Sequence, residues 1–165
     1  MKDTVGIKLL KKYLTRMVKY FLRKGGMIMS LDRFIKMHEL DYDRALGEIK
    51  NGYKQSHWMW YIFPQVKGLG TSYMADYYGI RDLKEAKEYL SNEILRSHLI
   101  EISESLLRLN SNDALEIMGY PDNLKLHSSM TLFALTDSKC DIFQKVLDKF
   151  FDGKMDENTM KLLEK

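Results

Sequence analysis

The sequence predicts an all-α fold, a single compact multi-helix domain of about seven to nine helices with a basic amphipathic helix in front of it. Three observations predict it. Apolar residues recur at steps of three and four along most of the chain. Cap residues and glycines divide these periodic stretches into short segments. The pairs Asn51-Gly52 and Asp152-Gly153 both fit helix ends better than β-hairpin turns. With 165 residues and 45% hydrophobic content, one domain can bury a core without disulfides.

Residues 1–28 differ in charge from the rest of the chain. They contain eight Lys or Arg and one acid, whereas residues 29–165 contain 18 basic and 22 acidic residues. Gly25-Gly26 is expected to end a helix in this segment. The apolar positions with helical spacing are Ile7, Leu10, Leu14, Met17, Val18 and Phe21. Such a helix suits an anionic membrane surface or a partner. The alternatives are an ordinary surface helix or an extension from a misplaced start codon. We expect a boundary between residues 1–28 and a helical domain over 29–165.

Within residues 29–165 each expected helix has its own start and stop. Ser30, Asp41, Ser56 and Asp82 are typical N-caps. Pro64 is expected to stop the apolar run 57–63, whose periodicity alone does not separate strand from buried helix. The sequence predicts a loop over 66–71 and a turn over 119–121. The expected helices cover 30–37, 41–52, 56–63, 72–78, 82–90, 93–109, a short stretch ending at 118, 122–135, 141–151 and a last turn or two after 156.

The segment from Lys54 to Gln65 is the first candidate site. It contains both tryptophans of the chain, Trp58 and Trp60, next to His57. On a helix starting near Lys54, positions 54, 57, 58 and 61 share a face. A cation, an imidazole, an indole and a phenol together suit an anionic or planar ligand, and His57 could act as general acid or base. The alternative is that His57 is a satisfied histidine and the tryptophans belong to the core.

The second candidate site lies between Asp122 and Phe133. On a helix, Asp122, Lys125 and Ser128 or Ser129 fall on one side, and hydroxyls beside a lysine suit a phosphate or carboxylate. The alternative is a helix with Asp122 at its start, a surface lysine, and serines that allow close helix packing.

Several classes of function have no support in the sequence. Cys140 is the only cysteine, which excludes a disulfide framework and fits a cytoplasmic protein. His38, His57, His98 and His127 have no metal-ligand spacing, no dinucleotide or Walker fingerprint occurs, and so we expect no metal and no cofactor. Residues 29–165 lack a basic field, so no nucleic-acid partner is expected there. No apolar run is long enough to span a membrane. The sequence leaves the oligomeric state open.

Long motifs in this chain resemble a known family, the domain of unknown function 1810, whose members are often labelled calpastatin-like. The resemblance covers Leu31 to Leu163 and implies a compact, mainly α-helical cytosolic bacterial protein with no established activity. It implies no catalytic residue, and the family's motif usually begins close to the N-terminus. The motifs are Lys54-x-Ser56-His57-Trp58-Met59-Trp60, Phe63-Pro64-Gln65, Gly68-Leu69-Gly70-x-Ser72, Glu85-Ala86-x-x-Tyr89-Leu90 and Asp122-x-x-Lys125-Leu126-x-Ser128-Ser129-Met130-Thr131-Leu132-Phe133.

The order of the helical motifs is also similar to that in proteins of the NADAR (YbiA-like) group, which act on ADP-ribose-type N-glycosides. Two hypotheses follow. In the first, a polar pocket binds a small anionic, nucleotide-like ligand. Lys54, Lys125, Trp58, Trp60, Gln65, Ser128 and Ser129 contact it, and His57 or Asp122 transfers a proton if a hydrolytic step occurs. In the second, the domain is a non-enzymatic interaction or structural module that meets its partner through Tyr73, Tyr77 and Tyr78 or through the basic N-terminal segment.

Overall fold

A computed structural model describes residues 31–164 of the chain. These residues belong to one compact unit. The amphipathic helix expected in residues 1–28 and the Ser30 cap lie outside the described residues, so both stay predictions.

The described part of the chain confirms the all-α prediction, because its regular elements are nine helices. No helix among residues 31–164 is both long enough and apolar enough to cross a membrane. In chain order the helices are α2 (Asp32–Lys50), α3 (Met59–Ile62), α4 (Tyr73–Tyr78), α5 (Leu83–Ser91), α6 (Glu93–Arg108), α7 (Ala114–Met118), α8 (Asp122–Thr136), α9 (Ile142–Phe151) and α10 (Glu157–Leu163).

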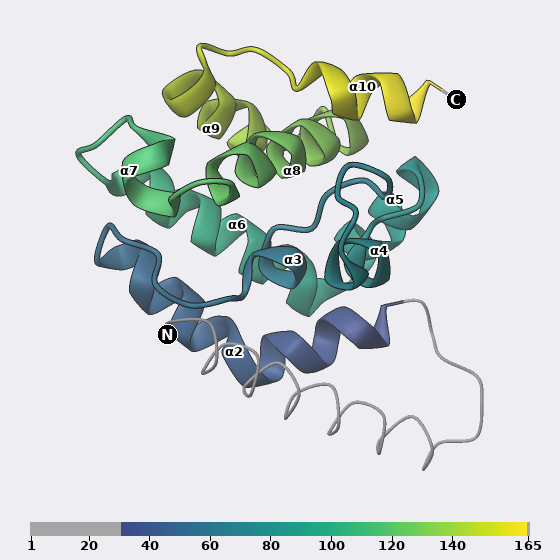
Figure 1. Ribbon diagram of the computed structural model, residues 1–165, viewed down its shortest axis with the longest axis horizontal. Helices are drawn as coiled ribbons and strands as arrows, with labels where there is room; N and C mark the ends of the chain where they lie inside the picture. The colour runs from purple at the N-terminus through teal and green to yellow at the C-terminus, as the bar shows by residue number, and fades with distance from the viewer. Residues whose placement is uncertain (1–30, 165) are drawn as a thin grey trace. The chain divides into compact units, whose positions relative to one another are not determined.

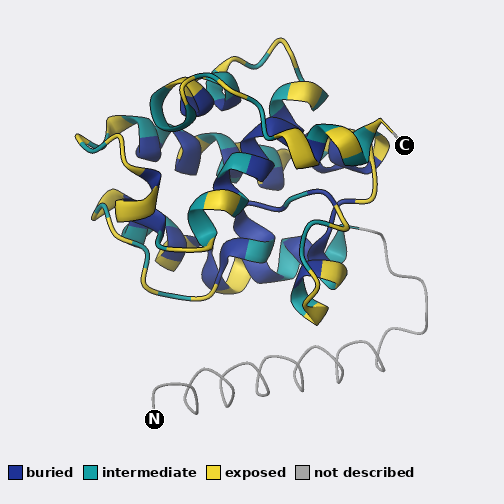
Figure 2. Cartoon of the chain, turned by 45° about the horizontal axis from the view of Figure 1, so that its top comes forward, coloured by how far each residue is buried: buried dark blue, intermediate teal, exposed yellow. Residues whose placement is uncertain are grey.

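The long helix α6 runs through the middle of the domain (Figure 1). It packs against α2, α5 and α9, while α8 packs against α5, α7, α9 and α10. Leu99, Ile102 and Leu106 of α6 and Leu126, Met130 and Phe133 of α8 are fully buried. These buried residues come from helices far apart in the sequence. Figure 2 shows that the buried stretches, in dark blue, gather toward the middle of the domain. Burial of these apolar side chains is the main favourable term that holds the helices together.

Helix α2 corrects one prediction of the sequence. A single helix covers Asp32–Lys50, where two helices, 30–37 and 41–52, were expected. Asp41 lies in the middle of this helix rather than at an N-cap, and it is only 3% exposed. Its carboxylate accepts a hydrogen bond from the Tyr61 hydroxyl. The carboxylate therefore binds Tyr61 and not a backbone N–H of a first helical turn, although the residue type had indicated an N-cap.

The helix expected over 56–63 is also shorter than predicted. Helix α3 covers only Met59–Ile62, with Trp58 at its N-cap position and no capping bond from Ser56. Positions 54, 57, 58 and 61 therefore do not share one helix face, because residues 53–57 precede the helix in an irregular loop. The structure confirms that this segment contains a helix and that the helix ends before Pro64. The reason is that a proline disfavours helical backbone at the residue before it, here Phe63.

Capping contacts confirm the starts of three predicted helices. The Ser72 hydroxyl accepts from the Ala75 N–H, and the Asp82 carboxylate accepts from the Glu85 N–H. At α10 the Asp156 carboxylate accepts from the Thr159 N–H. Each bond satisfies a backbone donor that the first turn of a helix leaves free.

The predicted 66–71 loop contains one short backbone pairing. Val66 and Ile80 form an isolated parallel bridge, in which the Lys67 N–H donates to the Ile80 carbonyl at 2.7 Å. The Ile80 N–H donates to the Gln65 carbonyl at 2.9 Å. This bridge places the chain that follows α3 beside the chain that follows α4, and so brings Gln65 close to Gly79.

Candidate functional site at the junction of α3 and α8

Glu48, near the end of α2, holds the loop that carries Lys54 and Trp58. Its carboxylate accepts hydrogen bonds from the Gln55 N–H at 2.8 Å and from the Ser56 N–H at 3.0 Å. It also accepts from the Ser56 hydroxyl and, at 2.8 Å, from the Trp58 indole N–H. Burial alone would raise the pKa of Glu48, but these hydrogen bonds outweigh burial and lower the pKa. The ionised carboxylate thus fixes the loop before α3.

Asp122, at the start of α8, joins the two candidate lysines. Its carboxylate lies 2.7 Å from the Lys54 ammonium and 2.8 Å from the Lys125 ammonium. The Lys54 side chain is 6% exposed and that of Lys125 is 20% exposed. Burial would raise the pKa of Asp122, but the two ammonium groups outweigh burial and lower the pKa. The cluster of Lys54, Asp122 and Lys125 therefore carries a net charge of about +1 at neutral pH.

Each lysine of this cluster also lies over a tryptophan. The Lys54 nitrogen is 4.8 Å from the centroid of the Trp58 ring, and the Lys125 nitrogen is 4.7 Å from that of Trp60. Trp58 is fully buried, whereas Trp60 is half-buried. These are cation–π distances, and they fix the ammonium groups over electron-rich ring faces.

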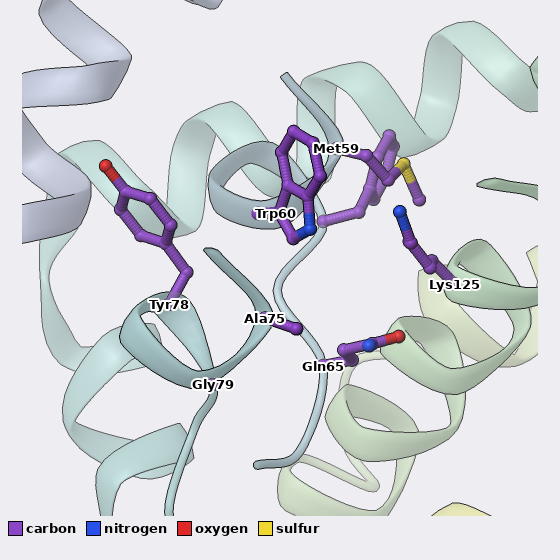
Figure 3. Close-up of a pocket in the computed structure, with 8 residues that line it drawn as sticks. Met59, Trp60, Gln65, Ala75, Tyr78, Gly79 and Lys125 are labelled. Atoms are coloured by element: carbon purple, nitrogen blue, oxygen red, sulfur yellow. The ribbon is translucent and has the colours of Figure 1, made fainter. Parts of the chain in front are cut away.

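Trp60, Gln65 and Lys125 line a small pocket next to this cluster (Figure 3). The Lys125 side chain reaches from α8 toward Trp60 and Met59, while the Tyr78 hydroxyl points away from it. The cavity measures about 10 Å³, room for about one water molecule. A pocket for a whole drug-sized ligand is larger by more than tenfold. The remaining lining residues are Met59, Phe63, Ala75, Tyr78 and Gly79.

The structure does not bring the other predicted residues into this pocket. His57 is exposed on the loop before α3 and is not part of the lining. The Ser128 hydroxyl instead donates to the Leu124 carbonyl at 3.1 Å and lies 3.4 Å from the Asp156 carboxylate. Ser129 is fully buried, and its hydroxyl has no hydrogen-bond partner among the described residues. Both serines are thus buried where α8 packs against its neighbours.

Sequence reasoning missed Glu48 and most of the apolar wall of the pocket. Glu48 is an unremarkable acid within a helix, and its partners Gln55, Ser56 and Trp58 follow seven to ten residues later in an irregular loop. No local pattern connects them. Gly79 and Ala75 also line the pocket, and Gly79 lies next to the Val66–Ile80 bridge, for which the sequence has no signal.

A second, more open concavity lies between α7, α8 and α9. This groove measures about 650 Å³ and is lined by Leu115, Leu124, His127, Phe150 and Phe151 together with polar residues of the 111–113 turn. Leu115 and Leu124 are each 51% exposed. No group of three or more His, Cys, Asp or Glu side chains in residues 31–164 could hold a metal ion.

Comparison with known proteins identifies the family of this chain. A family model described as "Protein of unknown function (DUF1810)" matches residues 28–163. The chain belongs to this family. The match confirms the resemblance seen in the motifs and spans both halves of the Lys54–Asp122–Lys125 cluster.

A solved structure supports the same assignment. The crystal structure of the conserved hypothetical protein Rv1873 from Mycobacterium tuberculosis is similar to this chain, with 39% sequence identity and a TM-score of 0.80. The similarity covers 82% of this chain and 96% of that protein. No curated protein matches the chain. The comparisons therefore support the fold and the family, and they bring no activity with them.

Proposed function

We propose that this domain binds a small anionic, nucleotide-like molecule at the junction of α3 and α8. The observation that carries the proposal is the position of the Lys125 ammonium, over the Trp60 ring and at the wall of a pocket. An ammonium group has three donors, and one of those of Lys125 is used by Asp122. A phosphate or carboxylate oxygen at the pocket can take another, and the Gln65 amide can add a hydrogen bond.

The size of the pocket limits which part of the ligand it holds. A cavity of about 10 Å³ takes one anionic oxygen in place of a water molecule. A base or sugar therefore lies outside the cavity, along the half-buried Trp60 ring, where stacking stabilises a planar group. In this arrangement Trp58 and Lys54 are supporting residues, because Trp58 is fully buried and Lys54 is bound to Asp122.

The finer proposal is hydrolysis of an ADP-ribose-type N-glycoside, with His57 or Asp122 transferring the proton. The lowered pKa of Asp122 keeps this carboxyl ionised at neutral pH, so it suits a base or a charge stabiliser rather than a proton donor. His57 is exposed and free to approach a ligand bound over α3. A cytoplasmic location stays a prediction, which the single cysteine supports.

Thermal unfolding of the full chain with ADP-ribose, AMP and inorganic phosphate tests the binding proposal. A ligand at about 100 times its Kd stabilises the folded state by about 2.7 kcal/mol, which raises Tm by several degrees. We expect a saturable rise that Lys125→Gln abolishes. Lys145→Gln is the matched control, because Lys145 pairs with Asp141 on the exposed surface of α9.

Two outcomes would contradict parts of this proposal. No rise in Tm with any of the three compounds at about 10 mM would exclude affinities in the millimolar range or better and so reject the ligand site. Binding of ADP-ribose without turnover of its N-glycosides would retain the site and reject the hydrolase. Loss of turnover in His57→Gln with unchanged binding would support His57 as the proton-transfer group.

A protein-interaction module is the second candidate, and the groove between α7, α8 and α9 favours it. Two half-exposed leucines and the half-buried Phe150 and Phe151 give this groove an apolar floor, with the exposed Asp113 at its edge. Residues 29–165 have an excess of acidic residues. The occupant that fits is a basic amphipathic helix of a partner, because its apolar face and charges complement the groove. Binding of such a partner that Leu124→Lys abolishes would support this function.

A further inference from the structure

A buried pair of histidines connects α2 to α6. The two Nδ1 atoms of His38 and His98 are 3.0 Å apart, and the rings are parallel within 1°. His38 is 2% exposed, and its Nε2 lies 2.9 Å from the backbone carbonyl of Tyr61 in α3. His38 thus contacts two helices that are distant from it in the sequence.

The positions of protons on this pair follow from its partners. A backbone carbonyl only accepts, so His38 must carry a hydrogen on Nε2 to bind Tyr61. In the neutral ring, Nδ1 of His38 is then an acceptor, and the hydrogen between the rings belongs to Nδ1 of His98. The Tyr89 hydroxyl, 3.3 Å from Nε2 of His38, shares the same hydrogen as an acceptor.

The same geometry determines how many protons the pair can accept. One added proton is compatible with the contact, since one Nδ1 can still donate to the other. Two added protons are not, because two N–H groups and two positive charges would then face each other across 3.0 Å. The second proton must therefore break the contact.

We propose that His38 and His98 form an acid-sensitive clasp that joins α2 to α6 and α3 and opens when both imidazoles are protonated. The clasp does not rest on the proposed ligand function, and it uses none of the residues assigned to the ligand site. Its opening acts on α3, because Nε2 of His38 contacts the backbone of Tyr61, which lies one residue after Trp60.

The charged and titratable groups around the clasp come from four helices. From α2, Asp41 binds the Tyr61 hydroxyl and Arg44, while Asp43 lies close enough to stabilise a proton on His98. Tyr42 of α2 stacks on His98 with ring centroids 3.6 Å apart and donates to Glu101 of α6. Lys50 lies 4.0 Å from Glu101, and Tyr61 and Tyr89 complete the surroundings from α3 and α5. The acidic groups favour the first proton on the less buried His98.

The pKa values agree with this order of protonation. Burial, opposed by the Tyr61 contact and assisted by His98, lowers the pKa of His38 to about 4 from its usual 6.5. Burial also lowers the pKa of His98, against the pull of Glu101 and Asp43. The unfolded chain therefore binds more protons than the folded chain between about pH 6.5 and 4, and stability falls as the pH falls through this window.

Urea unfolding of the full chain at about pH 7.5 and pH 5 measures this loss of stability. Both pH values lie above the range in which most carboxylates titrate. From His38 alone we expect the unfolding equilibrium constant to be roughly 30-fold larger at the lower pH. Tryptophan fluorescence is a suitable probe, since both tryptophans lie at α3. Equal stability at the two pH values would overturn the proposal.

Two variants and one spectrum test whether the histidine pair causes the loss of stability on acidification. His98→Gln keeps a neutral donor toward His38 but adds no second charge, so we expect a smaller loss of stability on acidification than in the wild type. His57→Gln is the matched control, because His57 is exposed, and it should keep the wild-type loss. Imidazole ¹⁵N spectra of the wild type at neutral pH should show hydrogen on Nε2 of His38 and none on its Nδ1. Hydrogen on Nδ1 of His38, or an unchanged acid response in His98→Gln, would refute the clasp.

Discussion

Glu48 organises the candidate site, because its single carboxylate binds three residues of the segment 55–58. Its partners are the backbone of Gln55, the backbone and hydroxyl of Ser56, and the indole of Trp58. Hydrogen bonds to a charged group contribute more to stability than neutral ones. The orientation of Trp58, and with it the ring face beneath Lys54, therefore depends on this residue.

We expect Glu48→Gln to lower the free energy of unfolding by about 1 to 3 kcal/mol, because the amide removes the charge and turns one acceptor into a donor. Urea denaturation at neutral pH measures the change. Glu104→Gln is the control, since the pair of Glu104 with Arg108 is exposed and contributes at most about 1 kcal/mol. Similar effects of the two substitutions would show that Glu48 does not organise the loop.

At the scale of elements, the Val66–Ile80 bridge depends on close approach of two backbone segments. A Cβ atom at Gly79 would lie 2.8 Å from both Cα and Cβ of Lys67 and 2.9 Å from the Ala75 carbonyl. Real Cβ atoms essentially never come so close to backbone, so only glycine fits here without a shift. Gln65 and Gly79, which flank the bridge, line the pocket that Trp60 and Lys125 share.

We therefore expect Gly79→Ala to destabilise the domain by about 1 to 3 kcal/mol through overpacking. Gly47→Ala is a matched control with the opposite expected sign. Gly47 lies within α2 with no atom within 4 Å of an added Cβ, so alanine should stabilise this helix by about 0.5 to 1 kcal/mol. Thermal or urea unfolding of both variants measures the two changes in the free energy of unfolding. A neutral Gly79→Ala would mean that the bridge can move without cost.

At the scale of the whole molecule, ionised carboxylates connect distant parts of the chain. Glu85 of α5 is 1% exposed and accepts from Arg33 of α2 and from Arg81. Burial would raise the pKa of Glu85, but these arginines and the Arg81 N–H outweigh it and lower the pKa. Glu48 and Asp122 behave in the same way. All three residues join segments that are separate in the sequence.

Acid should therefore destabilise the domain further in a second range, which overlaps the lower end of the histidine window and extends below it. A carboxyl with a lowered folded pKa contributes stability above its unfolded pKa and loses it as the pH falls through the folded value. We expect the free energy of unfolding to fall further below about pH 4.5, and Glu85→Gln to make this fall less steep. Glu157→Gln is the control, because Glu157 and Lys161 are both exposed. A fall of equal steepness in Glu85→Gln and the wild type would contradict the role of Glu85.

Some features of the site followed from residue types alone. Lys54, Asp122, Lys125, Trp58 and Trp60 were candidates on charge and aromatic character, and the structure places all five in one set of contacts. Their predicted arrangement was wrong, since the helix face proposed for the first segment does not exist. Tyr78, expected among exposed aromatics, is 1% exposed, whereas Tyr73 is 62% exposed.

The histidine pair shows why the other contacts could not be predicted from the sequence. His38 and His98 are 60 residues apart, and neither has a metal-ligand or catalytic spacing in the sequence. Only the packing of α2 against α6 brings their rings together. The same holds for Arg33 and Glu85, 52 residues apart.

By itself the sequence determined the all-α class, most helix limits, the family and the residue types at the candidate site. Local physics decides the all-α class and the helix limits, through the 3.6-residue period, side-chain caps and the constraint that Pro64 places on Phe63, whereas the family followed from the motifs. The tertiary structure decided that α2 is continuous, that α3 is short, and that one carboxylate joins Lys54 to Lys125. These depend on partners far along the chain, because a buried polar group is satisfied by whichever element packs against it.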